Sequence, residues 1–120
     1  MVKEIKKLLM DQKGDVFVFG TGFWGGWIYK LLDKSDLPVK AFIDNNPEYQ
    51  KMQLFGHNVY SPEKLKVGNA VVFIASVEFQ DEIAGQLKDY HNEDLRIIKF
   101  SEIKDMGMKI FFETKHEEIK

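Results

Sequence analysis

The apolar residues of this chain follow two spacings, which divide most of it into alternating strands and helices. Short, continuously apolar runs rich in β-branched and aromatic residues are typical of buried strands. The predicted strands lie at 15–19, 39–43, 70–75 and 95–100, with a weaker one at 56–60. Apolar residues at helical spacing predict helices at 2–9, 24–32 and 76–90, the last with Phe79, Ile83, Leu87 and Tyr90 on its buried side. Ser61 and Pro62 suggest a capped helical turn at 61–65.

This alternation predicts an α/β fold. Strands that are apolar throughout, rather than at every second residue, indicate a parallel sheet covered on both faces. We therefore expect a three-layer, Rossmann-like sandwich around about five parallel strands in the order 3-2-1-4-5. Residues 1–100 would form this domain, and 101–120 a tail whose apolar patch at 109–112 is an edge strand, a dimer contact or a partly ordered end.

A glycine motif lies between the first predicted strand and the second helix. Gly20, Gly22 and Gly25 give the pattern G-x-G-x-x-G in the strand-to-helix setting that the motif requires. In that setting the first glycine permits the tight turn, the second lets the backbone approach a diphosphate, and the third lets the helix lie close to the strand. The free N–H groups at the start of the helix would then face an anion.

An acid stands at the expected distance from this motif. Asp44 ends the second predicted strand, 19 residues after Gly25, where a carboxylate accepts hydrogen bonds from a ribose hydroxyl. The same charge repels a 2′-phosphate, which favours NAD over NADP. Alternatively, Asp44 only caps the turn that Asn45 begins, and the glycines serve close packing in a fold that binds no ligand.

Three further residues bear on the site. Phe23 would project toward the phosphates, whereas the indole of Trp24 would fill core space. Ser76 follows the central strand and would either cap the next helix or contact a ligand. The candidate cofactor-binding residues are Gly20, Thr21, Gly22, Phe23, Trp24, Gly25, Asp44, Asn45 and Ser76.

Composition narrows the possible functions. With 17 basic and 19 acidic side chains the net charge is −2, which disfavours nucleic acid as a partner. The chain has no cysteine, so it has no disulfide and no thiolate metal site. The apolar runs are too short to span a membrane, and the N-terminus lacks a signal sequence, so we expect a cytoplasmic protein.

The sequence contains no recognisable catalytic or metal-binding pattern. The three histidines lack metal-ligand spacing, and no catalytic group is assigned. The Tyr60-x-x-x-Lys64 pattern of short-chain dehydrogenases is attributed to chance, because Pro62 interrupts it.

Four segments together resemble a known group of domains. They are 16–22, 41–47, 56–65 and 74–76, which read VFVFGTG, AFIDNNP, GHNVYSPEKL and IAS. Over about residues 13–100 the chain is similar to Rossmann-like domains of nucleotide-sugar dehydratases and epimerases, of sugar acetyltransferases in polysaccharide biosynthesis, and of some methyltransferases and glycosyltransferases. The resemblance implies that Gly20, Gly22, Gly25 and Asp44 line a nucleotide or nucleotide-sugar pocket. It also implies a separate catalytic domain, so the chain would be a fragment or an accessory module.

Two functions follow as hypotheses. The first is a module that binds NAD or a UDP-sugar for a sugar-modifying protein. The second is a ligand-free interaction domain, appended to a methyltransferase or glycosyltransferase, that forms a homodimer or docks on the catalytic domain through Phe111 and Phe112.

Overall fold

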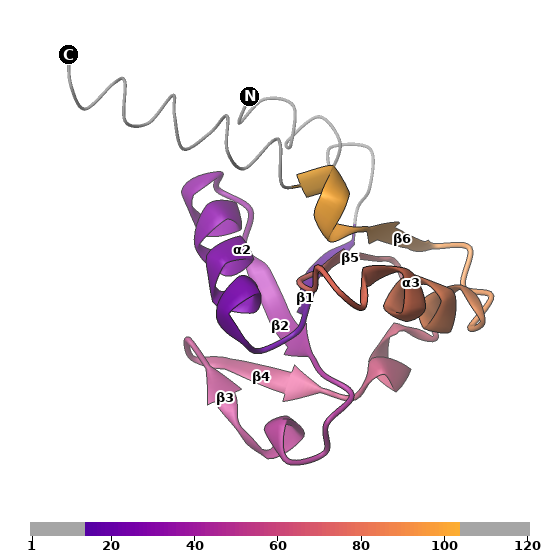
Figure 1. Cartoon of the computed structure of the whole chain (residues 1–120), viewed down its shortest axis with the longest axis horizontal. Coiled ribbons are helices and arrows are strands. Elements are labelled where there is room, and N and C mark those ends of the chain that lie inside the picture. Colours follow the sequence, from indigo (N-terminus) through magenta and orange to yellow (C-terminus); the bar gives the residue numbers. More distant parts are fainter. Residues whose placement is uncertain (1–13, 104–120) are drawn as a thin grey trace.

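The computed structural model describes residues 14–103 and places helices around one central sheet (Figure 1). Its strands are β1 (Asp15–Phe19), β2 (Val39–Ile43), β3 (Gln53–Leu54), β4 (His57–Tyr60), β5 (Ala70–Ile74) and β6 (Leu95–Ile98). Its helices are α2 (Phe23–Lys34), α3 (Gln80–Lys88) and the short 3-10 helices η1 (Tyr49–Lys51) and η2 (Pro62–Leu65). A further helical turn follows β6 at residues 100–103.

The sheet has the order β3-β4-β2-β1-β5-β6, and every pairing is parallel except that of β3 with β4. Its parallel strands, counted along the chain, have the order 3-2-1-4-5. This confirms the predicted α/β class. The strand count differs by one, because the short antiparallel strand β3 was not expected. The strand order reverses at β1, so the carboxyl ends of β1, β2 and β5 meet at one edge of the sheet, where ligands of such folds bind.

Alternate side chains of the central strand supply two separate cores. Val18 packs in one cluster with Ile28 and Leu32 of α2, whereas Phe17 packs in a second with Leu87 of α3. Each side chain is almost completely buried, and burial of one such side chain is worth about 1.5–3 kcal/mol. The two clusters hold α2 and α3 on opposite faces, which gives the predicted three layers.

A tight hairpin joins β3 to β4. Its two turn residues, Phe55 and Gly56, both have positive φ, at 50° and 78°, as a two-residue hairpin of type I′ requires. Positive φ is unusual for a bulky residue. Here the Phe55 ring stacks on Tyr29 of α2, with centroids 4.7 Å apart and planes 1° from parallel. This contact fixes the edge of the sheet against α2 and offsets part of the backbone strain.

The third predicted helix is shorter than its pattern suggested. It begins at Gln80 instead of Ser76, because residues 76–79 form a turn in which the Ser76 hydroxyl accepts a hydrogen bond from the Phe79 N–H at 3.0 Å. The Phe79 side chain, predicted to be buried, is 52% exposed. The last strand ends at Ile98, and Phe100 belongs to the helical turn that follows.

Two predicted features lie outside the described residues, the helix at 2–9 and the apolar patch at 109–112. Within residues 14–103, no helix has the length and apolar character needed to cross a membrane.

Candidate functional site

The glycine loop runs from the end of β1 to the start of α2, as the motif predicts. Gly20 has a φ of 123°, which favours glycine, and its N–H donates to the Ile43 carbonyl at 2.7 Å. Gly22 is the N-cap residue of α2 and gives this helix no side-chain cap. The first N–H groups of a helix have no partner within it. Those at the start of α2 are therefore placed to receive an anion.

Gly25 provides the close approach expected of the third glycine. A Cβ atom there would lie 2.2 Å from the Gly20 carbonyl oxygen, whereas one at Gly22 would meet no atom within 4 Å. Only glycine therefore lets α2 lie this close to the loop, and the space beside Gly22 is open.

Asp44 lies beside the glycine loop and also caps the turn after β2. Its Oδ2 accepts a hydrogen bond from the Thr21 hydroxyl at 3.0 Å, and its Oδ1 accepts one from the Asn46 N–H at 2.9 Å. Because each carboxylate oxygen has two lone pairs, the half-buried side chain can still accept hydrogen bonds from a ligand.

An open cleft of about 290 Å³ lies at this carboxyl edge of the sheet. It is lined by Phe19, Gly20, Asp44, Asn45, Ser76, Phe79, Glu82, Ile83 and Gln86. Four predicted site residues are thereby brought together: Gly20, Asp44, Asn45 and Ser76. Thr21 joins them through its hydrogen bond to Asp44, whereas Gly22, Phe23, Trp24 and Gly25 are outside the lining.

Two amide side chains connect the walls of the cleft. Asn45 donates to Gln86 at 3.1 Å, and Gln86 donates back to Asn45 at 2.8 Å. The pair joins the loop after β2 to α3. Sequence reasoning missed Gln86, although it follows Ile83 by three residues and therefore lies on the same side of α3.

The charges at the cleft are negative. Its lining contains the carboxylates of Asp44 and Glu82, and it includes no lysine or arginine. A phosphate here would therefore depend on backbone N–H groups. Among the described residues, no three histidine, aspartate or glutamate side chains gather into a group that could hold a metal ion.

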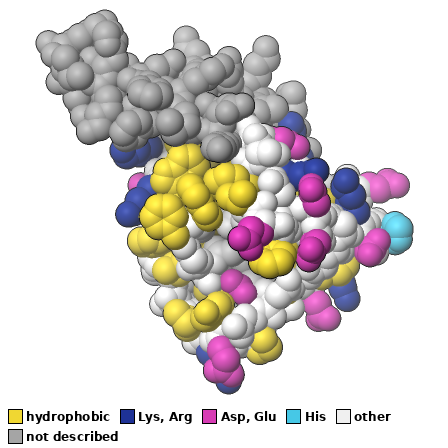
Figure 2. Space-filling view, viewed as in Figure 1, with side chains coloured by type: hydrophobic (Ala, Val, Ile, Leu, Met, Phe, Trp, Pro, Cys, Tyr) yellow, Lys and Arg dark blue, Asp and Glu magenta, His cyan; other side chains and the backbone are white. Residues whose placement is uncertain are grey.

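The tryptophan of the motif does not behave as expected. Trp24 is 38% exposed instead of filling the core, and its indole meets the rings of Phe23, Trp27 and Phe100 edge to face, with centroids 4.8–5.7 Å apart. Phe23 is 77% exposed. Figure 2 shows hydrophobic side chains gathered at the left of that view, the side on which α2 lies. Neither tryptophan is among the residues that line the carboxyl-edge cleft, so the indole rings do not fill it.

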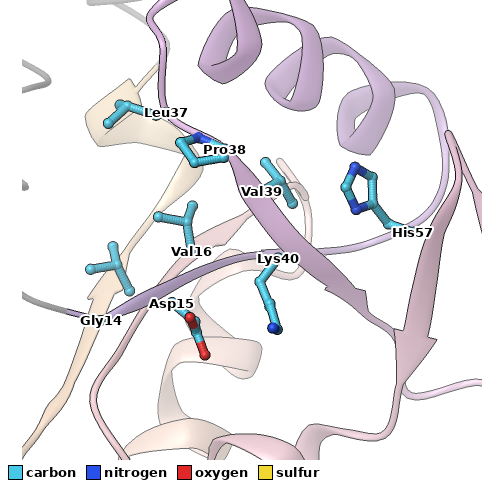
Figure 3. A pocket seen from close by; sticks show the side chains of 9 residues that line it. Gly14, Asp15, Val16, Leu37, Pro38, Val39, Lys40 and His57 are labelled. Carbon is cyan, nitrogen blue, oxygen red and sulfur yellow. The ribbon is translucent and has the colours of Figure 1, made fainter.

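A larger hollow of about 490 Å³ lies at the opposite, amino edge of the strands (Figure 3). Apolar side chains such as Val16, Leu37 and Val39 make up most of its lining, and it borders Gly14, the first described residue. It has neither the glycine loop nor the start of α2. The carboxyl-edge cleft is accordingly the candidate site.

This fold and this glycine loop define a Rossmann-like α/β domain. More particularly, residues 10–98 match the family model described as C2185-like, N-terminal, and the chain belongs to that family. No curated protein matches its sequence significantly.

Solved structures of other proteins share the fold. The structure of RSP, a Rex-family repressor, has a TM-score of 0.55 at 15% identity, over 98% of this chain and 66% of RSP. UDP-D-quinovosamine 4-dehydrogenase from Vibrio fischeri has a TM-score of 0.51 at 20% identity, over 78% of this chain and 83% of that one. The chain thus spans slightly less than two thirds of RSP. These likenesses confirm the fold that the sequence resemblance implied.

One expectation about partners is wrong. The net charge was taken to disfavour nucleic acid as a partner. However, RSP has also been solved with NAD+ and operator DNA. That structure matches this chain with a TM-score of 0.54 and 15% identity, over 98% of this chain and 64% of that one. A domain of this fold can therefore belong to a DNA-binding protein, and charge balance alone does not exclude nucleic acid.

Proposed function

We propose that this chain is a nucleotide-binding module that holds NAD or a nucleotide-sugar at the carboxyl edge of its sheet. The observation that carries the proposal is the hydrogen bond between the Thr21 hydroxyl and the Asp44 carboxylate, 3.0 Å long. It joins the glycine loop to the acid beside an open cleft, so groups suited to phosphate and to ribose lie next to each other.

Each part of such a ligand has a matching group. The N–H groups at the start of α2 would hold the diphosphate, and the free lone pairs of Asp44 would accept the ribose hydroxyls. The half-exposed ring of Phe79 and the side chain of Ile83 would pack against the flat face of a base. The Asn45–Gln86 pair would hydrogen-bond to its polar edge.

The charge of the cleft favours NAD over NADP. A 2′-phosphate would lie near Asp44, with Glu82 in the same lining and no basic side chain to balance it. Like charges that lie in the same cleft repel each other even when partly screened by water.

Related folds support the choice of ligand. RSP has been solved with β-NADH, in a structure that matches 98% of this chain with a TM-score of 0.50, and another neighbour is a UDP-sugar dehydrogenase. Together with the sequence resemblance, this favours a cytoplasmic accessory role in polysaccharide biosynthesis, beside a transferase or a nucleotide-sugar dehydratase or epimerase.

Calorimetric titration with NAD+, NADP+ and a UDP-sugar tests the proposal. The informative variant is Asp44→Asn, because asparagine can still accept from the Asn46 N–H and can donate to the Thr21 hydroxyl, but it loses the negative charge and one acceptor oxygen for the ribose. We expect NAD+ affinity to fall about tenfold, the loss of one charge-assisted hydrogen bond. Glu93→Gln, an exposed carboxylate outside the cleft lining, should bind like wild type. If neither NAD+ nor a UDP-sugar binds saturably at millimolar concentration, the proposal is refuted.

A further inference from the structure

The segment at residues 99–103 contacts both helices that begin at the candidate site. Phe100 is buried, and its ring lies 4.8 Å from that of Trp24 in the first turn of α2. On the other side, Lys99 reaches Asp81 in the first turn of α3, with Nζ 2.7 Å from Oδ1. A short segment after the last strand is thus connected to the starts of α2 and α3.

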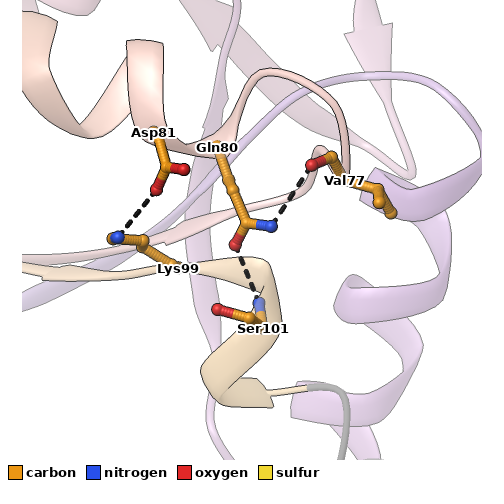
Figure 4. A network of polar contacts seen from close by, with 5 residues as sticks. All are labelled: Val77, Gln80, Asp81, Lys99 and Ser101. Carbon is orange, nitrogen blue, oxygen red and sulfur yellow. Dashed lines mark hydrogen bonds and ion pairs between the residues drawn. The ribbon is translucent and has the colours of Figure 1, made fainter.

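Gln80, the first residue of α3, makes the most direct of these connections (Figure 4). Its side-chain nitrogen donates to the Val77 carbonyl at 3.2 Å, and its side-chain oxygen accepts from the Ser101 N–H at 2.9 Å. One amide group therefore joins the turn at 76–79 to the turn at 100–103.

The turn at 76–79 is a wall of the cleft. Ser76 and Phe79 both line the cleft, and the hydrogen bond between them closes the turn. Val77 lies between these two residues, so a displacement of the wall moves the carbonyl to which Gln80 is bonded. Any shift of that carbonyl changes the position at which Gln80 can also bond to Ser101.

We propose that Gln80 is a positioning residue that couples occupancy of the cleft to the conformation of the turn at 100–103. This inference rests on the proposed function. A ligand that contacts both the glycine loop and the wall at 76–79 fixes the spacing between α2 and α3. Trp24 contacts Phe100, whereas Gln80 transmits the position of the wall to Ser101. Because such coupling is reciprocal, the conformation of the turn also sets the affinity of the cleft.

The amide resonance of Ser101 in the 15N-labelled full chain, titrated with NAD+, reports this coupling. We expect the Ser101 resonance to shift with the same saturation curve as that of Gly22. None of the NAD+ contacts proposed above involves Ser101 itself, so the shift would report transmission through Gln80.

Two substitutions separate the two bonds of Gln80. Gln80→Glu keeps an acceptor for the Ser101 N–H but cannot donate to the Val77 carbonyl, whereas Gln80→Ala loses both. We expect Gln80→Glu to bind NAD+ about threefold to tenfold more weakly, the usual effect of one hydrogen bond, and Gln80→Ala to bind at least as weakly because it loses two. In Gln80→Glu, the Ser101 amide should stay protected from exchange without ligand but no longer respond to NAD+. Gln53→Ala, which removes an exposed amide bonded to Asn58 on the outer strand, is the matched control and should behave like wild type.

The outcomes distinguish the coupling from the proposed function. If Gly22 and Asp44 shift on titration but Ser101 does not, or if Gln80→Glu still transmits the shift, the coupling through Gln80 is refuted and the nucleotide site stands. If neither NAD+ nor a UDP-sugar shifts Gly22 or Asp44, the proposed function fails, and this inference fails with it.

Discussion

Alanine substitutions at two adjacent glycines of α2 should change stability in opposite directions. Gly25 and Gly26 are both helical, so each alanine gains up to about 1 kcal/mol from helix propensity. At Gly26 the new Cβ would make an ordinary contact, 3.6 Å from the Phe55 ring. At Gly25 it would lie 2.2 Å from the Gly20 carbonyl oxygen, about 1 Å inside the usual contact distance.

The overlap at Gly25 cannot be relieved by a side-chain rotation, because the atoms it meets belong to the backbone of the glycine loop. α2 would have to move outward, loosening the packing of the fully buried Ile28 and Leu32. Overpacking of this kind costs about 1–3 kcal/mol or more. After the gain in propensity, we expect Gly25→Ala to lose about 1–2 kcal/mol and Gly26→Ala to gain about 0.5–1 kcal/mol.

Urea unfolding followed by far-UV circular dichroism measures both values. The two variants share the same helix and the same change in composition, so their difference isolates the contact with the loop. If Gly25→Ala proves as stable as Gly26→Ala, α2 does not lie against the glycine loop as described.

Three further outcomes are expected. Thr21→Val, which removes the donor to Asp44, should weaken NAD+ binding about fivefold, whereas Thr21→Ser keeps the hydroxyl and should not. Phe55→Ala should cost about 1 kcal/mol in urea unfolding through loss of the stack on α2, and the similarly exposed Met52→Ala should cost less. The Asp81 carboxylate raises the pKa of Lys99, chiefly through their hydrogen bond and then through its charge. The resulting stabilisation is present below the ordinary lysine value of 10.5 and lost as the pH rises through the raised pKa. The difference in urea midpoint between wild type and Lys99→Met should therefore narrow as the pH rises above 10.5.

The sequence was sufficient for the elements whose patterns are local. Strands such as β1 and β5 are continuously apolar, and the glycines that follow β1 allow few backbone paths, so the parallel order and the position of Asp44 could be predicted. The hairpin at Phe55 could not. Its turn lacks the Asn-Gly or Asp-Gly pair that marks such turns, and its conformation is supported by the ring of Tyr29, distant in sequence.

The cleft was predicted only in part for a similar reason. Phe79 has the helical spacing of a buried residue, but the Ser76 hydroxyl closes a turn ahead of α3 and leaves the ring half exposed in the cleft wall. Local hydrogen bonds of serine compete with helix formation, and periodicity does not register them. Gln86 was missed because an amide on a helix carries no motif, and its role depends on Asn45, which lies 41 residues away.

A crystal structure of the chain with NAD+ would show whether the carboxyl-edge cleft is the nucleotide site. We expect the diphosphate on the N–H groups at the start of α2, a ribose hydroxyl on the Asp44 carboxylate, and the base in the cleft beside Phe79. NAD+ bound in the hollow at the amino edge of the strands, or bound at the carboxyl edge without contact to Asp44, would contradict this expectation.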